Sequence, residues 1–488
     1  MVKVLKELFA RLDDENIHYC HWKSNFQLEN ALEGKGDLDL LVDRRDVQRF
    51  EGVLGLQGFK RAVDVLQAAF SPIFHYFQWD EERGTFVHLH VYYRMVTGES
   101  LLKNYHLPLE ELLLQSPRRI DGVPVPAAAV ELIVFILRIM AKHSSLLEYF
   151  LLRRSYPAAQ KELSALLAAC SMEECHRLLA EWLPGVQPEL FDACLQAIED
   201  SKSFSCRYRL AVRLHQRLKA YDRYSSLSKP YRRAVLYLKR IIRRMAGNRR
   251  SKRLASGGAV IAFIGPEASG KSTLARQSGR WLGEVFEVEA VHFGRPPSTW
   301  LSFLPNLLLP LARKVGDPRR TSRMEENPGG AGEARVSLLY ALRAVWVAWD
   351  RCALAIKTSR KASGGRIVIC DRYSSAAVGA ADSAKLAVSA GRGFKSAVLN
   401  HLVKLEHDLY GKIPPPDIVI MLKVPLELAL DRNRDRQKKG KETDAYLARR
   451  HAGFAAHLFP SAAIIELDTN QAEQDVIRSA RQIIWKFI

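Results

Sequence analysis

The sequence predicts an α/β protein: a doubly wound parallel-sheet domain at residues 256–488, preceded by a small α+β domain at 1–124 and a helical region at 125–255. Two observations predict the last domain. An apolar strand at 260–264 runs into a glycine-rich loop and a helix. Strand and helix patterns then alternate to the end of the chain, which is typical of parallel strands joined by crossover helices.

The first region contains a strand pattern, Gly36-Asp37-Leu38-Asp39-Leu40-Leu41-Val42. Asp37 and Asp39 are two residues apart, so a strand places both carboxylates on one face. Two carboxylates this close suit a divalent metal ion. Upstream, Trp22-Lys23-Ser24-Asn25 ends a short apolar strand and opens a helix. The alternative is an exposed strand face without a ligand.

The second region shows helical apolar spacing at 127–141, 158–169, 172–182 and 189–198. It ends in a basic segment, 207–253, which holds 17 lysines and arginines and one acidic residue and so carries +16 of the chain's net +20.

A helix with an apolar stripe lies inside this basic segment, at 232–245. Three interpretations of it stay open. The helix packs against a neighbouring element, segment 229–253 binds an anionic membrane surface, or it binds nucleic acid. Nucleic acid is the least favoured because no aromatic stacking series or nucleic-acid fold motif accompanies the charge.

Residues 265–272, Gly-Pro-Glu-Ala-Ser-Gly-Lys-Ser, fit the phosphate-binding pattern G-x-x-x-x-G-K-[ST]. Its glycines let backbone N–H groups turn toward phosphate, and the following helix adds its partial positive charge. Lys271 is expected to reach the β- and γ-phosphates of ATP, and Ser272 to bind Mg²⁺. The predicted nucleotide-binding residues are Gly265, Ser269, Gly270, Lys271, Ser272 and Thr273.

A second apolar run, 366–370, ends in Asp371-Arg372-Tyr373. Ligands of parallel α/β sheets lie at the carboxyl ends of the strands. Asp371 is therefore expected beside the loop, where it can hold Mg²⁺ through water, and Arg372 is placed to meet an acceptor phosphate. The alternative is a surface Asp-Arg pair.

With these motifs, residues from about 258 to 488 resemble the thymidylate kinase family of P-loop nucleotide kinases. Further matches are Glu267, the helix pattern 338–343 and the strand pattern 416–425. The resemblance implies a kinase whose catalytic residues include Lys271, Asp371 and Arg372. It also implies acceptor contacts from Glu267, Arg343, Arg372 and Tyr373, and an arginine lid over ATP drawn from Arg432, Arg434 and Arg436.

The same stretch departs from the family around the acceptor. Ser374–Asp382 lacks the Tyr-Gln pair that frames the base, Arg295-Pro296-Pro297 replaces Arg-Glu-Pro-Gly-Gly, and residues 298–332 form an insertion. A pocket that reads a base by hydrogen bonds discriminates poorly without those partners. The expected acceptor is a nucleotide or sugar-like molecule other than thymidylate.

The first region resembles the nucleotidyltransferase fold, with a Lys23-Ser24 turn where that family has Gly-Ser and with Asp37 and Asp39 as its metal pair. His88 stands where a third carboxylate is usual, and imidazole suits Zn²⁺ or Mn²⁺ better than Mg²⁺. This domain is therefore expected to bind nucleotide without turning it over. His88 and His90 as plain surface residues are the alternative. The whole arrangement resembles bacterial proteins associated with polysaccharide biosynthesis.

The favoured function is an ATP- and Mg²⁺-dependent phosphotransferase. A nucleotide-binding regulatory or assembly protein and a bifunctional kinase/nucleotidyltransferase are the alternatives. The chain has no run of 18 apolar residues and begins without a signal-peptide pattern, which favours the cytoplasm, with a peripheral position on the inner membrane face as an option. Seven scattered cysteines predict reduced, mostly buried thiols. The oligomeric state is not indicated.

Overall fold

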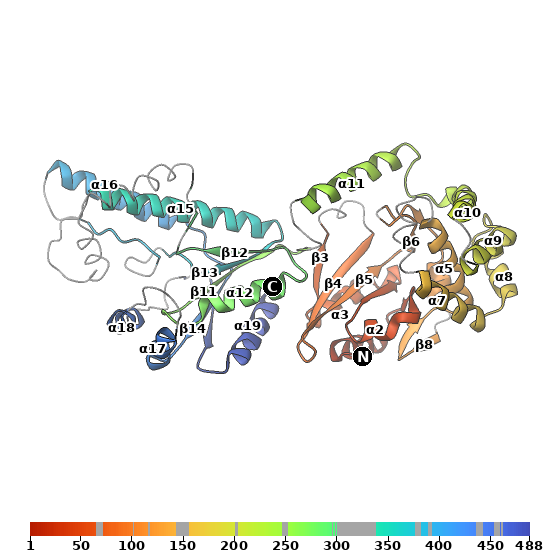
Figure 1. The fold of residues 1–488 in the computed structure, drawn as a ribbon, viewed down its shortest axis with the longest axis horizontal. Helices are drawn as coiled ribbons and strands as arrows, with labels where there is room; N and C mark the ends of the chain where they lie inside the picture. Colours follow the sequence, from red (N-terminus) through yellow and green to blue (C-terminus); the bar gives the residue numbers. More distant parts are fainter. Residues whose placement is uncertain are drawn as a thin grey trace. The chain divides into compact units, whose positions relative to one another are not determined.

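The computed structural model forms two compact units, Met1–Lys252 and Arg253–Ile488 (Figure 1). The predicted boundary at 124/125 thus lies inside the first unit. The structure describes residues 1–64, 72–100, 102–115, 118–142, 156–200, 204–245, 252–294, 296–297, 299, 338–375, 382–388, 393–435, 443–452, 459 and 462–488.

The first unit contains a mixed sheet with strands in the order β1-β2-β5-β4-β3. Only β2 and β5 pair in parallel; the other neighbours are antiparallel. The strands are β1 (Tyr19–His21), β2 (Asp37–Val42), β3 (Lys60–Val63), β4 (Ile73–Asp80) and β5 (Thr85–Tyr92). Shorter elements of this unit are α2 (Leu28–Leu32), β6 (Val96–Thr97), β7 (Tyr105–His106), α4 (Glu110–Gln115), β8 (Arg118–Ile120) and β9 (Val123–Val125).

The two faces of this sheet differ because side chains alternate along each strand. Leu38 and Leu40 of β2, with Leu89 of β5, belong to the core that also contains residues of α1 (Lys3–Asp14) and α3 (Val47–Leu56). Asp37 and Asp39, with His88 and His90, therefore lie on the opposite face. The predicted one-sided placement of the two aspartates is confirmed.

The predicted helices of the second region are confirmed. They are α5 (Ala128–Lys142), α7 (Tyr156–Ala169), α8 (Met172–Trp182) and α9 (Pro188–Glu199), followed by α10 (Phe204–Arg217). α5 is almost entirely buried, and it shares a core with Trp22, Leu41 and Tyr92 from the sheet. This shared core explains why the sheet and the helices form one unit.

The basic segment contains α11 (Ser228–Met245). Leu236 is buried, whereas most of the predicted apolar stripe is open to solvent: Leu238 is 58% exposed and Met245 is 84% exposed. Ile241 and Ile242 are exposed as well. Residues 246–251 of segment 229–253 lie outside the described residues. The described residues thus leave most of this stripe uncovered.

The second unit is built on five parallel strands in the order β12-β13-β11-β14-β15. They are β11 (Ala259–Ile264), β12 (Val288–His292), β13 (Ile367–Asp371), β14 (Ile418–Lys423) and β15 (Ala463–Asp468), after the two-residue β10 (Arg253–Leu254). Its helices are α12 (Lys271–Leu282), α15 (Leu338–Ser363), α16 (Phe394–Gly411), α17 (Leu426–Arg434), α18 (Asp444–Ala452) and α19 (Glu473–Phe487).

The helices cover both faces of this sheet, with α15 and α16 on one face and α12 and α19 on the other (Figure 1). The predicted doubly wound parallel sheet is confirmed. The chain passes from central β11 to β12 and β13 on one side, then to β14 and β15 on the other. In such sheets ligands bind beyond the carboxyl ends of the strands, at the point where the order reverses.

All seven cysteines are free, and five of them are buried, as predicted. Among the described helices, none combines the length and apolar character that crossing a membrane requires.

Candidate active site

The loop after β11 owes its shape to two glycines. Gly265 has φ +155°, and a Cβ there would lie 2.9 Å from the carbonyl oxygen of Leu422. Gly270 has φ +93° and caps the amino end of α12. Backbone N–H groups at such a helix start are free to bind an anion. The predicted loop residues therefore surround one helix N-terminus.

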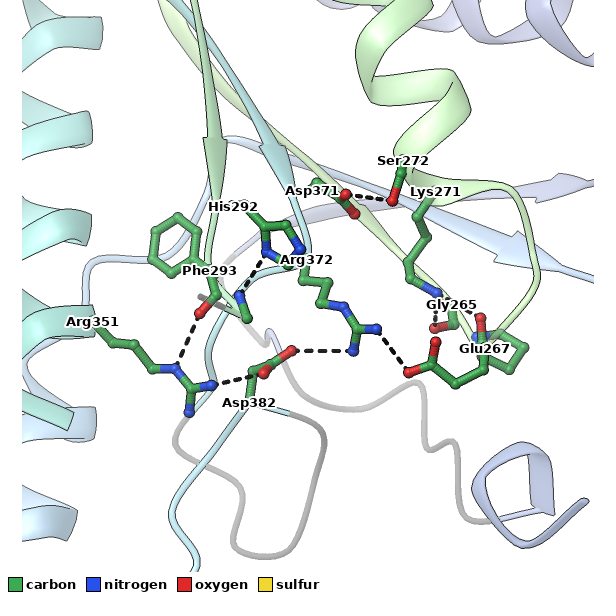
Figure 2. A network of polar contacts seen from close by, with 12 residues as sticks. Gly265, Glu267, Lys271, Ser272, His292, Phe293, Arg351, Asp371, Arg372 and Asp382 are labelled. Atoms are coloured by element: carbon green, nitrogen blue, oxygen red, sulfur yellow. Dashed lines mark hydrogen bonds and ion pairs between the residues drawn. The ribbon is translucent and has the colours of Figure 1, made fainter. Parts of the chain in front are cut away.

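Lys271 is buried inside this loop. Its Nζ donates to the carbonyl oxygens of Gly265, at 3.0 Å, and of Pro266, at 2.6 Å (Figure 2). The loop thereby holds the ammonium charge close to its own backbone N–H groups. This arrangement suits a polyphosphate, whose oxygens can replace the carbonyls as partners of the lysine.

Ser272 and Asp371 meet at the end of two neighbouring strands. β11 and β13 pair with Phe263 opposite Asp371, and the Ser272 hydroxyl donates to Asp371 Oδ2 at 2.5 Å. The other oxygen, Oδ1, is buried without a hydrogen-bond partner among the described residues. An orphan carboxylate oxygen beside a hydroxyl fits a hard divalent cation such as Mg²⁺. The structure brings these two predicted metal residues together.

A chain of charged groups extends from the loop toward α15 (Figure 2). Glu267 Oε1 lies 2.7 Å from Arg372 Nη2, and Arg372 Nη1 lies 3.5 Å from Asp382. Asp382 in turn accepts from Arg351 Nη2 at 2.7 Å. Arg372 has φ +71°, an unfavourable backbone conformation for a side chain of its size. The predicted acceptor residues Glu267 and Arg372 are thus direct partners.

The ion pairs keep these side chains charged despite their burial. Burial alone would raise the pKa of Glu267, but Arg372 and Lys271 bring it below its ordinary value. Burial likewise works to lower the pKa of Arg372, and Glu267 and Asp382 raise it above the ordinary value. Fixed charges of this kind are organised before a substrate binds.

Arg351 and Asp382 were not predicted as site residues. Arg351 Nε also donates to the carbonyl of Phe293 at 3.1 Å, and its Nη1 donates to the Tyr410 hydroxyl at 2.7 Å. A sequence signal for Arg351 did exist. It follows Arg343 by eight residues, about two helical turns, so both lie on one face of α15. No comparable signal marks Asp382, because tertiary packing alone brings it to Arg351.

A cavity of about 200 Å³ lies beside this chain of charges. Arg343, predicted to bind the acceptor, lines it together with Arg351 and Lys385. Within the described part of the chain, no acidic side chain forms an ion pair with Arg343 or Lys385. The full lining is Gly294, Pro296, Tyr340, Arg343, Ala344, Val347, Arg351, Lys385, Glu406 and Tyr410. The excess of cations suits an anionic ligand group.

Tyr373 requires a correction. Its ring is buried in the core against Phe293 and Phe459, and its hydroxyl donates to the carbonyl of Pro414 at 2.7 Å. Burial raises the pKa of this hydroxyl far above its ordinary value. A side chain held in the core cannot also face the acceptor, so Tyr373 is a packing residue.

Of the predicted lid arginines, the structure describes Arg432 and Arg434, and both have partners outside the loop. Arg432 Nη2 donates to the carbonyl of Thr469 at 2.8 Å, and exposed Arg434 pairs with Asp431 and Asp444. Arg436 lies outside the described residues, as does the 298–332 insertion apart from Thr299.

α17 and α18 nevertheless pack against the loop, because Ala268 shares a small core with Ala429 and Leu447. From α18, Arg450 is close enough to help lower the pKa of Glu267. Sequence reasoning missed Arg450, although it lies in the Arg449-Arg450 pair after the predicted lid.

A second polar site lies on the sheet of the first unit. His88 Nδ1 is 2.6 Å from Asp37 Oδ1, whereas Asp39 is 2.8 Å from Lys23 Nζ and 3.3 Å from His90 Nδ1. Burial works to raise the pKa of both aspartates, but these partners lower it, to about 2 for Asp37 and further for Asp39. The lysine thus occupies the place beside Asp39 where a metal ion was expected.

The Lys23-Ser24 turn has further cations around it. Arg138 Nη1 donates to the Ser24 hydroxyl at 3.2 Å. Burial, Lys23 and Lys142 lower the pKa of Lys103 well below its ordinary value. Lys103 and Arg138 were not predicted, since they come from elements far along the chain. A bound anion would offset the repulsion between these basic groups, so the turn suits an anion.

No protein-family model matches the chain. Thymidylate kinase from Cyanothece sp. (strain PCC 7425 / ATCC 29141) is 26% identical over 249 residues, which cover 46% of this chain and 93% of that protein. The second unit is about as long as the matched stretch. This distant similarity, with the phosphate-binding loop and the five-stranded parallel sheet, supports a kinase-like region in the chain.

Proposed function

We propose that the second unit is an ATP- and Mg²⁺-dependent phosphotransferase of the nucleoside monophosphate kinase type, with an anionic nucleotide or sugar-like acceptor. The observation that carries the proposal is the pair Ser272–Asp371 beside Lys271, with a cation-lined cavity beyond the Glu267–Arg372 ion pair. A donor site and an acceptor site thus lie on the two sides of that pair.

In this reaction the bond between the γ-phosphorus and the bridging β–γ oxygen of ATP breaks, and a bond from phosphorus to an acceptor oxygen forms. Lys271 and the N–H groups at the start of α12 hold the donor phosphates. Ser272 and Asp371 would hold Mg²⁺, which neutralises phosphate charge when it is bound. Arg372 stands between donor and acceptor and can stabilise the charge of the transferring group, because such reactions depend on positioning and electrostatics. Arg432, Arg434 and Arg436 remain lid candidates if α17 moves when ATP binds.

The acceptor side favours a phosphorylated or otherwise acidic molecule. Arg343 and Lys385 supply positive charge without an acidic partner in the described structure, while Glu406 accepts the backbone N–H groups of Lys385 and Leu386 and so fixes the cavity wall. The first unit, with Lys103 and Arg138 around its nucleotidyltransferase-like turn, fits nucleotide binding. The cation-lined cavity of the second unit and the turn of the first unit both favour a sugar-bearing acceptor, as in polysaccharide biosynthesis.

We also infer that segment 229–253 attaches the protein to an anionic membrane surface. The support is the exposed stripe of α11, formed by Leu238, Ile241, Ile242 and Met245, on a strongly basic helix. A helix with one apolar and one basic face lies in the interface of anionic lipids.

The function is tested by incubating the protein with γ-labelled ATP, Mg²⁺ and a bacterial metabolite extract, and identifying the labelled products by mass spectrometry. We expect one small acidic product that is absent with Lys271→Ala. ATP binding without any labelled product would instead support a nucleotide-binding regulatory protein.

A further inference from the structure

A row of imidazoles crosses the sheet of the first unit. His88 and His90 lie on one face of β5, and His75 of β4 is directly opposite His90 in the antiparallel register. One ring nitrogen from each of the three lies within 4.8 Å of the others. We propose that His75, His88 and His90 form a binding site for a divalent transition metal ion of the zinc type.

The separation of two of these nitrogens already suits such an ion. His75 Nδ1 lies 3.1 Å from His88 Nε2. Zinc–nitrogen bonds of about 2.0–2.1 Å in a tetrahedral site place ligand nitrogens roughly 3.3 Å apart. The ring of His88 is also fixed, because it stacks on Phe77 with ring centroids 4.0 Å apart.

The carboxylates contact the Nδ1 atoms of two of these rings, and Asp37 Oδ2 also lies 3.7 Å from His90 Nε2. Asp37 Oδ1 is 2.6 Å from His88 Nδ1, and Asp39 Oδ1 is 3.3 Å from His90 Nδ1. A carboxylate at Nδ1 accepts a hydrogen bond from the ring N–H there, which fixes the proton on Nδ1 and leaves the Nε2 lone pair for a metal. Because Asp39 orients the His90 ring and is not itself a ligand in this proposal, it can also pair with Lys23.

The donor set selects the class of ion. Imidazole nitrogens favour Zn²⁺ and its neighbours in the transition series, whereas Mg²⁺ favours oxygens. His75 is 8% exposed and the His90 side chain 19%, so the site is sheltered yet open on one side. Asp39 pairs with Lys23, and Asp37 lies against His88 and His90, so negative charge stands beside the rings. Three histidines leave a fourth position for water or a ligand atom.

The test uses the full-length, metal-stripped protein. Co²⁺ titration followed by visible absorption, with Zn²⁺ as competitor, gives the affinity, and X-ray absorption of the zinc-loaded protein identifies the ligands. We expect an imidazole shell in the parent protein. His90→Ala and His75→Ala should raise the Kd by at least about 100-fold, and Asp37→Asn by about 10- to 100-fold. His176→Ala on α8, whose ring pairs with Asp192 away from this sheet, is the matched control and should leave the Kd unchanged.

Three results would overturn the proposal. The first is a zinc-loaded parent protein without an imidazole shell, which needs no variant and so does not depend on how His75→Ala folds. The second is unchanged affinity in His90→Ala with the parent's circular dichroism spectrum. A loss of binding in Asp371→Asn would place the ion at the phosphate-binding loop and refute the histidine site as well.

Discussion

The two polar sites of this protein are assembled in different ways. The phosphate-binding loop takes its shape from consecutive residues, 265–272, whose two glycines fix the backbone around one helix start. The site in the first unit is formed by side chains from β2, β4 and β5, which meet only through strand register. A contiguous motif therefore predicts its own geometry, whereas a site made by register depends on the whole sheet.

The aspartates of the two sites show the consequence. Asp371 keeps one buried oxygen without a partner in the described structure, which leaves it available to a cation. Asp39 is paired with Lys23, and Asp37 with His88. Sequence reasoning assigned all three to metal binding, Asp37 and Asp39 from their spacing on one strand and Asp371 from its place at the carboxyl end of a strand beside the loop. The side chains around each aspartate determine whether its carboxylate is available to a metal ion or is already paired with a lysine or histidine.

The largest expected effect is that of Lys271→Ala. Loss of the ammonium group removes charge that stabilises the transferring phosphoryl group, so we expect the rate to fall by at least about 10³-fold. Metal binding by the first unit should not change. Lys357→Ala, an exposed position on α15, is the control for the labelled-product assay. Parent-like turnover in a folded Lys271→Ala protein would remove the kinase assignment.

Arg351→Ala tests the acceptor side of the same unit. The change leaves Asp382 without its 2.7 Å partner and removes a cation from the cavity, so kcat/KM for the acceptor should fall by about 100-fold. The KM for ATP should stay constant, because the loop is not touched. Steady-state kinetics with each substrate varied in turn give both values, with exposed Arg360→Ala as control. An equal fall in kcat/KM for the acceptor and for ATP would mean that Arg351 has a general structural role.

The double variant Asp37→Asn with Asp39→Asn tests the independence of the two sites. Metal affinity should fall by about 10- to 100-fold, because the imidazoles lose the carboxylates that orient them. Phosphoryl transfer should stay within about twofold of the parent, since separate cores rarely couple. Mn²⁺ and Zn²⁺ titrations measure the first quantity. Unchanged affinity for both ions would mean that the aspartates have no part in metal binding.

The smallest effect is expected for membrane contact. Each lysine or arginine near an anionic surface contributes about 1 kcal/mol, and salt screens the attraction over about 10 Å at 0.1 M. The protein should float with anionic vesicles and remain behind with neutral ones, and flotation with the anionic vesicles should fall as salt rises. Leu238→Ser with Ile242→Ser should reduce flotation. Equal absence from both kinds of vesicle would leave α11 as a structural helix.

Much of the fold was predictable because its signals are local. The apolar run of β11, the glycines of the loop and the helical spacing of α5 each appear in a short stretch of sequence. Tyr373 was misassigned because a strand-end position does not reveal which way the side chain turns, and here it turns into the core. His75 gave no signal at all. Its place beside His90 follows from the pairing of β4 with β5, which short sequence windows do not encode.

We propose that the second unit keeps the donor machinery of a thymidylate-kinase-like enzyme but accepts a different molecule. The most direct measurement is kcat/KM for dTMP with saturating ATP and Mg²⁺, on a preparation that labels a product in the metabolite extract. We predict a value well below about 10⁴ M⁻¹s⁻¹, the lower end of ordinary enzyme efficiency. A value between about 10⁴ and 10⁸ M⁻¹s⁻¹ would contradict the account and make this unit a thymidylate kinase.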